Sequence, residues 1–234
     1  MTDKLISAIT GVDWNANVRG SIGNTKTIAE MHASCERIAV WSQELENLDQ
    51  GNPAIAFVRG VQIAAQHVVA CVCLGLYSAA AASIRSVLES GLYYSYFRDH
   101  PKELKTLVDK DSYYLSRSQI IDYHKLHTAN FIDNQNALGL IGRLDSWYSN
   151  ISAVVHGQIP GTWVTFRSLT NVLPDPSTFV EVVRQFVLGE QILHEFLLIT
   201  VGVENWDVFN ATAKRTLSKG LAGDVRTRFQ LDRS

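Results

Sequence analysis

The sequence predicts an all-α protein, a single-domain bundle of about eight helices. Apolar residues recur at spacings of three and four over most of the 234 residues, as they do on the buried face of an α-helix. No run of β-branched residues alternates with a period of two, and only residues 162–166 form a short segment that could be extended. Since 46% of the residues are hydrophobic, the chain can bury a substantial core.

Apolar periodicity and helix-end signals together define the expected elements. We predict helices over residues 25–46, 52–73, 78–97, 101–109, 111–127, 134–155, 175–203 and 205–217. Asn52 and Pro53 have the form of a cap and a first-turn residue, and Gly75 marks a break before the alanine-rich third helix. Pro101 stops that helix and can occupy the first turn of the next one.

Signals in the second half of the chain are similar. Gly157 ends the sixth predicted helix, and the unpatterned residues 157–176 are expected to form a loop. Asp175 opens the long seventh helix, and Asn205 is expected to cap the last one.

The chain shows no internal repeat and no glycine- or serine-rich linker. We therefore expect one helical bundle domain over residues 25–221. An N-terminal segment, residues 1–24, precedes it, and a loosely held C-terminal tail, residues 222–234, follows it.

Composition indicates a cytoplasmic protein. The net charge of −2 gives no overall attraction to nucleic acid, so any phosphate binding must be local. Cys35, Cys71 and Cys73 are odd in number and have no C-x-x-C spacing, which indicates buried thiols in a reducing compartment. The N-terminus lacks the apolar core of a signal peptide, and the apolar run over residues 68–82 is too short for a bilayer span, so we expect no membrane partner.

The segment SIRSVLE places Arg85 and Glu89 one turn apart inside an otherwise apolar helix. A charge left alone in a core is costly, so both side chains must be paired or face a cavity. Two interpretations stay open: a buried clasp that fixes the register of neighbouring helices, and part of an active site.

A polar stripe precedes the glycine that ends the sixth predicted helix. Asp145, Ser149, Ser152 and His156 follow one another at spacings of four, three and four, and so share one face. His156 lies in the last turn, where the carbonyl ends favour the protonated imidazole and suit it to proton transfer. The alternative is a capping or interface histidine. The small residues of this face, together with Trp147, are expected to pack against a helix, which could belong to a second copy of the chain.

Arg117 and His124 form a second candidate catalytic pair. They lie seven residues apart on a predicted helix and therefore share a face. An imidazole that moves protons and a guanidinium that stabilises charge on phosphorus are the minimum requirement for metal-free RNA cleavage.

No cofactor or metal is expected. The chain contains neither the phosphate-loop motif nor the dinucleotide-binding glycine motif, and it lacks G-x-S-x-G. Glu190 and His194 lie one turn apart and could bind a metal only with further ligands, but no H-E-x-x-H motif accompanies them.

Three segments of the chain, LGLYSAAAASIRSVLESGLYYSYF, YSNISAVVHG and VGVENWDVF, resemble uncharacterised bacterial helical proteins akin to the HEPN superfamily. That superfamily includes toxins of toxin–antitoxin pairs, abortive-infection proteins and other antiviral-defence nucleases. The resemblance covers roughly residues 52–217, and its most specific elements are R-S-x-L-E and S-x-x-x-H-G. It implies a helical bundle, usually dimeric, whose nuclease members cut RNA without a metal through an R-x(4–6)-H motif near the dimer interface.

The sequence departs from this motif at His156. Ser149, Asn150 and Ile151 occupy the places where the arginine would stand, whereas Arg117 and His124 satisfy the spacing. The resemblance therefore implies that the arginine role has moved to Arg85, or that the protein is not a nuclease.

The leading hypothesis is a HEPN-like protein of a bacterial defence or toxin-type system that cleaves RNA without a metal. In it, His156 is the acid or base, Arg85 stabilises phosphate charge and Glu89 orients one of them. The expected partners are a second copy of the chain, RNA, and a cognate antitoxin or defence-system protein. The alternative hypothesis is a noncatalytic interaction or dimerisation module in which Arg85, Glu89 and His156 form a structural cluster.

Overall fold

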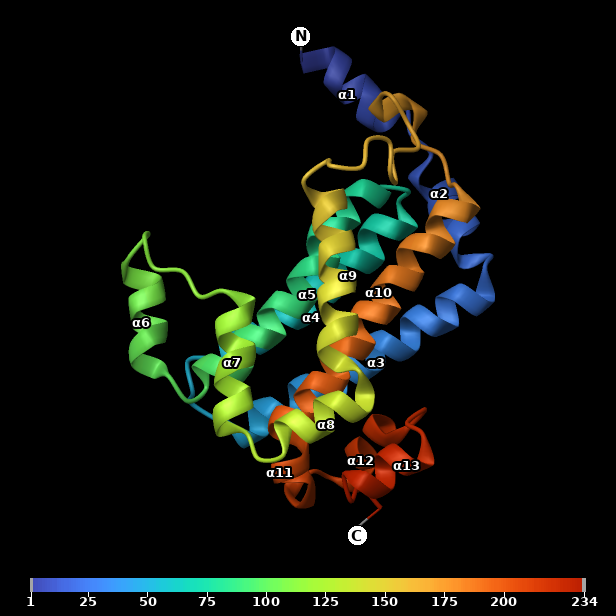
Figure 1. Cartoon of the computed structure of the whole chain (residues 1–234). Coiled ribbons are helices and arrows are strands. Elements are labelled where there is room, and N and C mark those ends of the chain that lie inside the picture. Colours follow the sequence, from blue (N-terminus) through green and yellow to red (C-terminus); the bar gives the residue numbers. More distant parts are fainter. Residues whose placement is uncertain (1, 233–234) are drawn as a thin grey trace.

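Five long helices form the body of the protein. The computed structural model describes residues 2–232, and these residues contain helices and no strand. The long helices are α3 (Thr25–Leu48), α4 (Ile55–Cys73), α5 (Tyr77–Phe97), α9 (Leu140–Val155) and α10 (Pro176–Leu197). Figure 1 shows them in the middle of the molecule, with α1 (Thr2–Thr10) at one end and α12 (Ala211–Ser218) and α13 (Gly223–Arg228) at the other.

Helix α5 is the centre of the bundle and packs against α4, α9, α10 and α7 (Arg117–His127). Its inward face is almost entirely apolar, with Ala80, Leu88 and Phe97 fully buried. Gly91 allows α10 to come close, because a Cβ at this position would lie 2.2 Å from a methyl carbon of Leu193. The alanine-rich composition of α5 thus permits tight packing on several sides.

Helix-end signals confirm much of the predicted pattern. Helix α3 begins at the expected residue, with the side chain of Asn24 accepting a hydrogen bond from the Thr27 amide. Helix α10 begins as predicted, because Asp175 accepts from the Thr178 amide at 2.7 Å. Helix α6 (Pro101–Asp109) has the expected bounds, with its proline in the first turn.

Two predicted helices in the middle of the chain are corrected. The predicted helix over residues 134–155 is two helices, α8 (Phe131–Leu138) and α9, since Gly139 takes a left-handed conformation with φ of +59° between them. The predicted helix over residues 111–127 begins only at Arg117, because Ser116 and Gln119 form a capping box there.

The prediction for the end of α10 is also wrong. The helix turns at Leu198–Gly202 into a π-helical segment, followed by α11 (Val203–Asn205) and a 3₁₀ turn at Trp206–Val208. Asn205 does not cap the last predicted helix. Asn210 caps α12 instead, because its side chain accepts hydrogen bonds from the backbone amides of Thr212 and Ala213.

Both ends of the described chain are helical, which adds helices to the eight predicted. The N-terminal segment contains α1 and α2 (Trp14–Ile22), and Asn17 of α2 donates a hydrogen bond to the Leu74 carbonyl at 3.1 Å. The described part of the tail, residues 222–232, is not loosely held: Phe229 and Leu231 are buried, and Trp206 Nε1 donates to the Leu231 carbonyl at 2.9 Å.

The loop before α10 contains a 3₁₀ turn at Leu169–Asn171 and no strand, so residues 162–166 are not paired in a sheet. Two helical stretches, Ile55–Cys73 and Pro176–Val208, are long and apolar enough to cross a membrane. In the second, 78% of the most apolar window is buried inside the protein, as expected of a core helix. The structure is compatible with a soluble protein.

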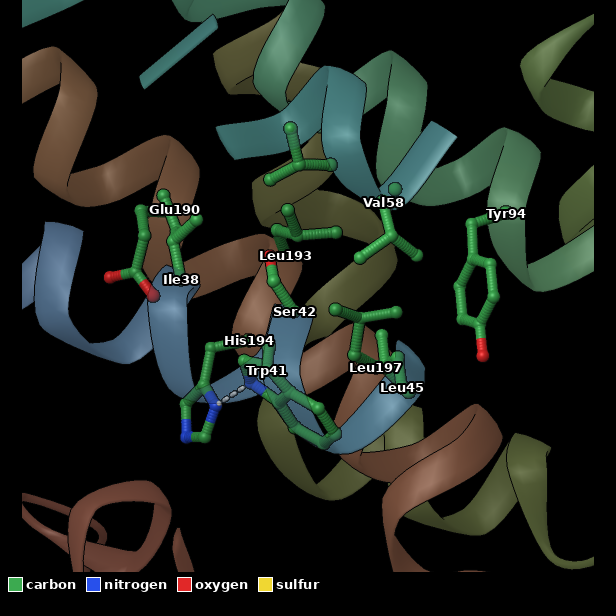
Figure 2. A pocket seen from close by; sticks show the side chains of 12 residues that line it. Ile38, Trp41, Ser42, Leu45, Val58, Tyr94, Glu190, Leu193, His194 and Leu197 are labelled. Atoms are coloured by element: carbon green, nitrogen blue, oxygen red, sulfur yellow. Dashed lines mark hydrogen bonds between the residues drawn. The ribbon is translucent and has the colours of Figure 1, made fainter. Parts of the chain in front are cut away.

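A buried polar cluster, formed by Arg37, Trp41, Glu190 and His194, joins α3 to α10. Arg37 pairs with both carboxylate oxygens of Glu190, and Trp41 Nε1 donates to His194 Nδ1 at 2.9 Å. Figure 2 shows Glu190, His194 and Trp41 beside a small cavity of about 20 Å³ with otherwise mostly apolar walls. Glu190 and His194 are only 1% and 2% exposed, so this cluster belongs to the core.

Candidate functional site

Helices α5 and α9 bring the three residues of the leading hypothesis together. Arg85 Nε donates to Glu89 Oε1 at 2.8 Å, and Arg85 Nη1 lies 3.1 Å from His156 Nε2. The predicted meeting of Arg85, Glu89 and His156 in space is therefore confirmed, with the guanidinium in contact with both other side chains.

Tyr148 is a member of this group that the sequence analysis missed. Its hydroxyl donates to Glu89 Oε1 at 2.6 Å, so one carboxylate oxygen accepts from both Arg85 and Tyr148. Burial and the adjacent Glu89 carboxylate raise the pKa of Tyr148, which keeps the phenol protonated and donating. The available signal was its position eight residues before His156, two turns back on nearly the same face.

Arg117 joins the same group from α7. Its guanidinium carbon lies 4.3 Å from the centre of the Tyr148 ring, and that of Arg85 lies 5.1 Å from the same ring. Arg117 Nη2 also pairs with Asp145 at 2.9 Å. Two arginines thus converge on one tyrosine, an arrangement favoured by the negative faces of the ring.

These side chains line an open cleft of about 280 Å³, which we call the arginine cleft and define by Arg85, Glu89, Arg117 and Tyr148. The rest of its lining consists of tyrosine and aliphatic side chains. They are Leu92, Tyr93, Tyr114, Leu115 and Ile120. A concave site in which a few polar groups converge is a common form of a binding site.

Solvent exposure separates the two interpretations of the Arg85–Glu89 pair. The side chains are 24% and 35% exposed, so the pair is a half-open contact at a cleft and not a buried clasp. Partial burial alone would lower the pKa of Arg85, but the hydrogen bond and charge of Glu89 outweigh it and raise that pKa. Arg85 therefore remains a guanidinium under all ordinary conditions.

His156 caps the C-terminus of α9 and is exposed beside the arginine cleft. Gly157 follows with φ of +65° and turns the chain away, which leaves the imidazole at the surface. A guanidinium can only donate hydrogen bonds, so the Nε2 atom that faces Arg85 acts as the acceptor.

The two residues of the second candidate pair, Arg117 and His124, lie in different environments. His124 is 3% exposed, with Nε2 at 2.9 Å from Ser95 Oγ and Nδ1 at 2.8 Å from Thr128 Oγ1. Burial, with the charge of Arg98 next in size, lowers the pKa of His124 to about 3. Arg117 faces the arginine cleft, so it lies with Arg85, and His124 is a satisfied core residue.

The polar stripe of α9 has a different environment at each position. Asp145 pairs with Arg117 and His156 contacts Arg85, while Ser149 is exposed. Trp147 packs within the same chain, because its Nε1 donates to the Gln185 carbonyl of α10 at 2.9 Å. A Cβ on Gly189 of α10 would lie 2.3 Å from the indole ring, which shows how closely the two helices approach.

Among the described residues, no three His, Cys, Asp or Glu side chains come together in a group that could hold a metal ion. Glu190 pairs with Arg37 and His194 accepts from Trp41, so these two helical neighbours have separate partners. The arginine cleft offers cations, a carboxylate and phenols, and the imidazole of His156 lies beside it in contact with Arg85.

Comparisons with known proteins add no assignment. The chain matches no family model, no curated protein and no solved structure.

Proposed function

We propose that the arginine cleft binds an RNA phosphodiester and that the protein is a metal-independent, HEPN-like endoribonuclease of a bacterial defence or toxin-type system. The observation that carries this proposal is the 3.1 Å contact between Arg85 Nη1, which lines the cleft, and Nε2 of the exposed His156 beside it. A cation beside an accessible imidazole is the pairing required to stabilise a phosphorane and move a proton.

The proposed reaction uses the 2′-hydroxyl of the RNA as the nucleophile. Arg85 Nη1 first exchanges His156 for a phosphate oxygen, which frees the single lone pair of His156 Nε2. Nε2 then accepts the proton of the 2′-hydroxyl as the 2′-oxygen bonds to phosphorus, and the bond from phosphorus to the 5′-oxygen breaks. The leaving 5′-oxygen takes a proton from water, and the hydroxide so formed removes the proton from His156, which gives a 2′,3′-cyclic phosphate, a 5′-hydroxyl and the original imidazole. Arg85 has five N–H donors, two of which contact Glu89 and His156, so donors remain for the phosphate oxygens.

Glu89 and Tyr148 hold Arg85 in position, since the carboxylate accepts from both. Arg117 supplies a second cation at the same cleft. Tyr114 is 70% exposed and lines the cleft, where its ring offers a surface on which a nucleobase can stack.

The alternative proposal is a noncatalytic interaction module. It is favoured by one observation: both arginines are already paired, Arg85 with Glu89 and Arg117 with Asp145, so the contacts link α5, α7 and α9 without a ligand. In either case a second copy of the chain, a cognate antitoxin and a cytoplasmic location remain part of the proposal.

RNA cleavage in EDTA distinguishes the two proposals. We expect His156→Ala to reduce the rate by about 10²- to 10⁴-fold, the usual contribution of general acid–base catalysis, with little change in melting temperature because His156 is exposed. Arg85→Gln should reduce it by about 10²- to 10³-fold. His67→Ala, an exposed histidine of α4, is the matched control and should cleave normally.

Three results would count against the nuclease. If wild type cleaves none of a varied set of RNAs, the interaction module is favoured. If only His124→Ala loses cleavage at matched folding, the chemistry lies on α7. If His156→Ala and His67→Ala cleave equally, His156 has no catalytic role.

A further inference from the structure

A second concentration of positive charge lies at the opposite end of the chain from α1, where α12 and α13 meet. Residues 211–228 contain five lysines and arginines and one aspartate, although the whole protein has a net charge of −2. Four of these cations, Lys214, Arg215, Lys219 and Arg226, line an open cleft of about 520 Å³, which we call the basic cleft. Asp232 also lines this cleft, so its lining has four cationic side chains and one carboxylate.

The four cations of the basic cleft have no carboxylate partner. None of them forms an ion pair with any residue in the described part of the chain, whereas ten other cations of the protein do. The Nε atom of Arg226 is also buried without a hydrogen-bond acceptor among the described residues. An N–H in this state loses its hydration without compensation, so no protein acceptor offsets the charge of Arg226 at this atom.

The backbone that carries these cations is packed against the rest of the protein. Helix α12 packs on α3 through Ala213 and Leu217, which are 3% and 0% exposed. The chain after α13 is held by buried Phe229 and by the hydrogen bond from Trp206 to the Leu231 carbonyl. Because the backbone is already ordered, the protein loses little conformational entropy when a ligand binds.

We propose that the basic cleft binds the sugar-phosphate backbone of a nucleic-acid strand. Closely spaced, unpaired cations are the usual electrostatic footprint of phosphate-backbone binding, and they act locally when the net charge is near zero. A membrane surface fits less well, since binding there needs exposed apolar side chains to insert. Among residues 211–232 no large hydrophobic side chain is exposed.

This proposal does not depend on catalysis, because the basic cleft and the arginine cleft share no residue. The basic cleft would hold a strand whether or not the protein cleaves it. Its test therefore uses an RNA that cannot react.

The experiment measures binding of a fluorescent 2′-O-methyl RNA strand by anisotropy over a range of salt concentrations. The variant combines Lys214→Gln, Arg215→Gln and Lys219→Gln. The matched control combines Lys26→Gln, Lys102→Gln and Lys110→Gln, which removes the same charge from exposed cations elsewhere. Melting temperatures check that both variants fold, and Lys219→Glu alone serves if the triple variant does not.

Each phosphate contact to a single strand contributes about 0.7 to the slope of log K against log salt. We therefore expect the basic-cleft variant to flatten that slope by about 2 and to weaken binding by about 100-fold near 0.1 M salt. The control should bind like wild type. Equal losses in both variants, an unchanged variant, or no binding by wild type would overturn the proposal. So would equal binding of polyglutamate, or binding of anionic vesicles in place of RNA.

Discussion

The buried polar cluster and the arginine cleft have an Arg–Glu pair with a nearby histidine in common, and these two groups differ in their access to water. In each, an arginine pairs with a glutamate and a histidine lies nearby. Glu190 is 1% exposed and its partner Arg37 is 19% exposed, whereas Arg85 and Glu89 are 24% and 35% exposed. His194 is buried and His156 is at the surface. Residue type and helical spacing are thus insufficient to separate a structural pair from a candidate site, and exposure makes the distinction.

The energetic consequences of this difference are large. Burial raises the pKa of Glu190, and the hydrogen bond and charge of Arg37 oppose that rise. The buried glutamate depends on its partner for solvation, because no water replaces it. Water can solvate Glu89 if Arg85 moves away. Arg85 can therefore leave Glu89 and bind a ligand at a low cost in free energy.

The largest expected effect is on stability, from Glu190→Gln. The change leaves the volume nearly unaltered and leaves Arg37 without a counter-charge, so we expect a loss of about 3–5 kcal/mol in the free energy of unfolding. Urea unfolding measures it. The control is Glu181→Gln on the same helix, whose partner Arg184 has a 60% exposed side chain and which should lose under about 1 kcal/mol. Equal losses would show that burial does not distinguish the pairs.

The next effect is a dependence of stability on pH. Burial lowers the pKa values of His124 and His194 to about 3 in the folded protein, while in the unfolded chain each has an ordinary pKa near 6.5. The unfolded chain therefore binds more protons, and stability falls as the pH drops from about 6.5 toward 3. Each histidine should remove about 2 kcal/mol between pH 7 and pH 5.

Urea unfolding of His124→Gln at several pH values checks this contribution. The variant should have a shallower pH dependence, by about 1.4 kcal/mol per pH unit near pH 5. His67→Gln removes an exposed histidine and should leave the slope unchanged. A slope in His124→Gln identical to that of wild type would mean that the buried imidazole is already protonated in the fold.

The smallest expected effect on stability comes from Glu89→Gln. A buried clasp would lose several kcal/mol, but the exposure of this pair limits the loss to about 1 kcal/mol or less. The same variant should nevertheless reduce RNA cleavage, since the carboxylate positions Arg85. Thermal melting measures the stability loss, and the cleavage assay measures the loss of activity. A large stability loss would mean that Glu89, like Glu190, is a structural core residue.

Local signals predicted the elements whose ends depend on local chemistry. Asp175 caps its helix as predicted, and the predicted start at residue 25 agrees with a cap by Asn24, because each cap needs only residues three positions away. The break at Gly139 was not predicted, since glycine inside an apolar helical pattern is often tolerated. The π-helical turn at Leu198–Gly202 was missed because the apolar residues continue through it in a run that is buried throughout.

The candidate site was predicted only in part for a related reason. Arg85, Glu89 and His156 carry polar signals inside apolar helices, so the cost of burying them pointed to contact. Tyr148 gave no such signal, because tyrosine is common on half-buried helical faces. Arg117 was matched with His124 by spacing along one helix, whereas its actual partners, Asp145 and Tyr148, lie on another helix and depend on the tertiary fold.

The contact between Trp147 and Gly189 has a consequence for how this protein can diverge. Any side chain at position 189 would occupy the space of the indole ring, since even a Cβ would lie 2.3 Å from it. A larger residue at 189 and a tryptophan at 147 are therefore mutually exclusive unless α9 and α10 move apart. Such a movement would shift Tyr148 and the Glu89 carboxylate that it contacts. We therefore expect positions 147 and 189 to covary among related sequences, and substitutions there to alter the arginine cleft as well as the core.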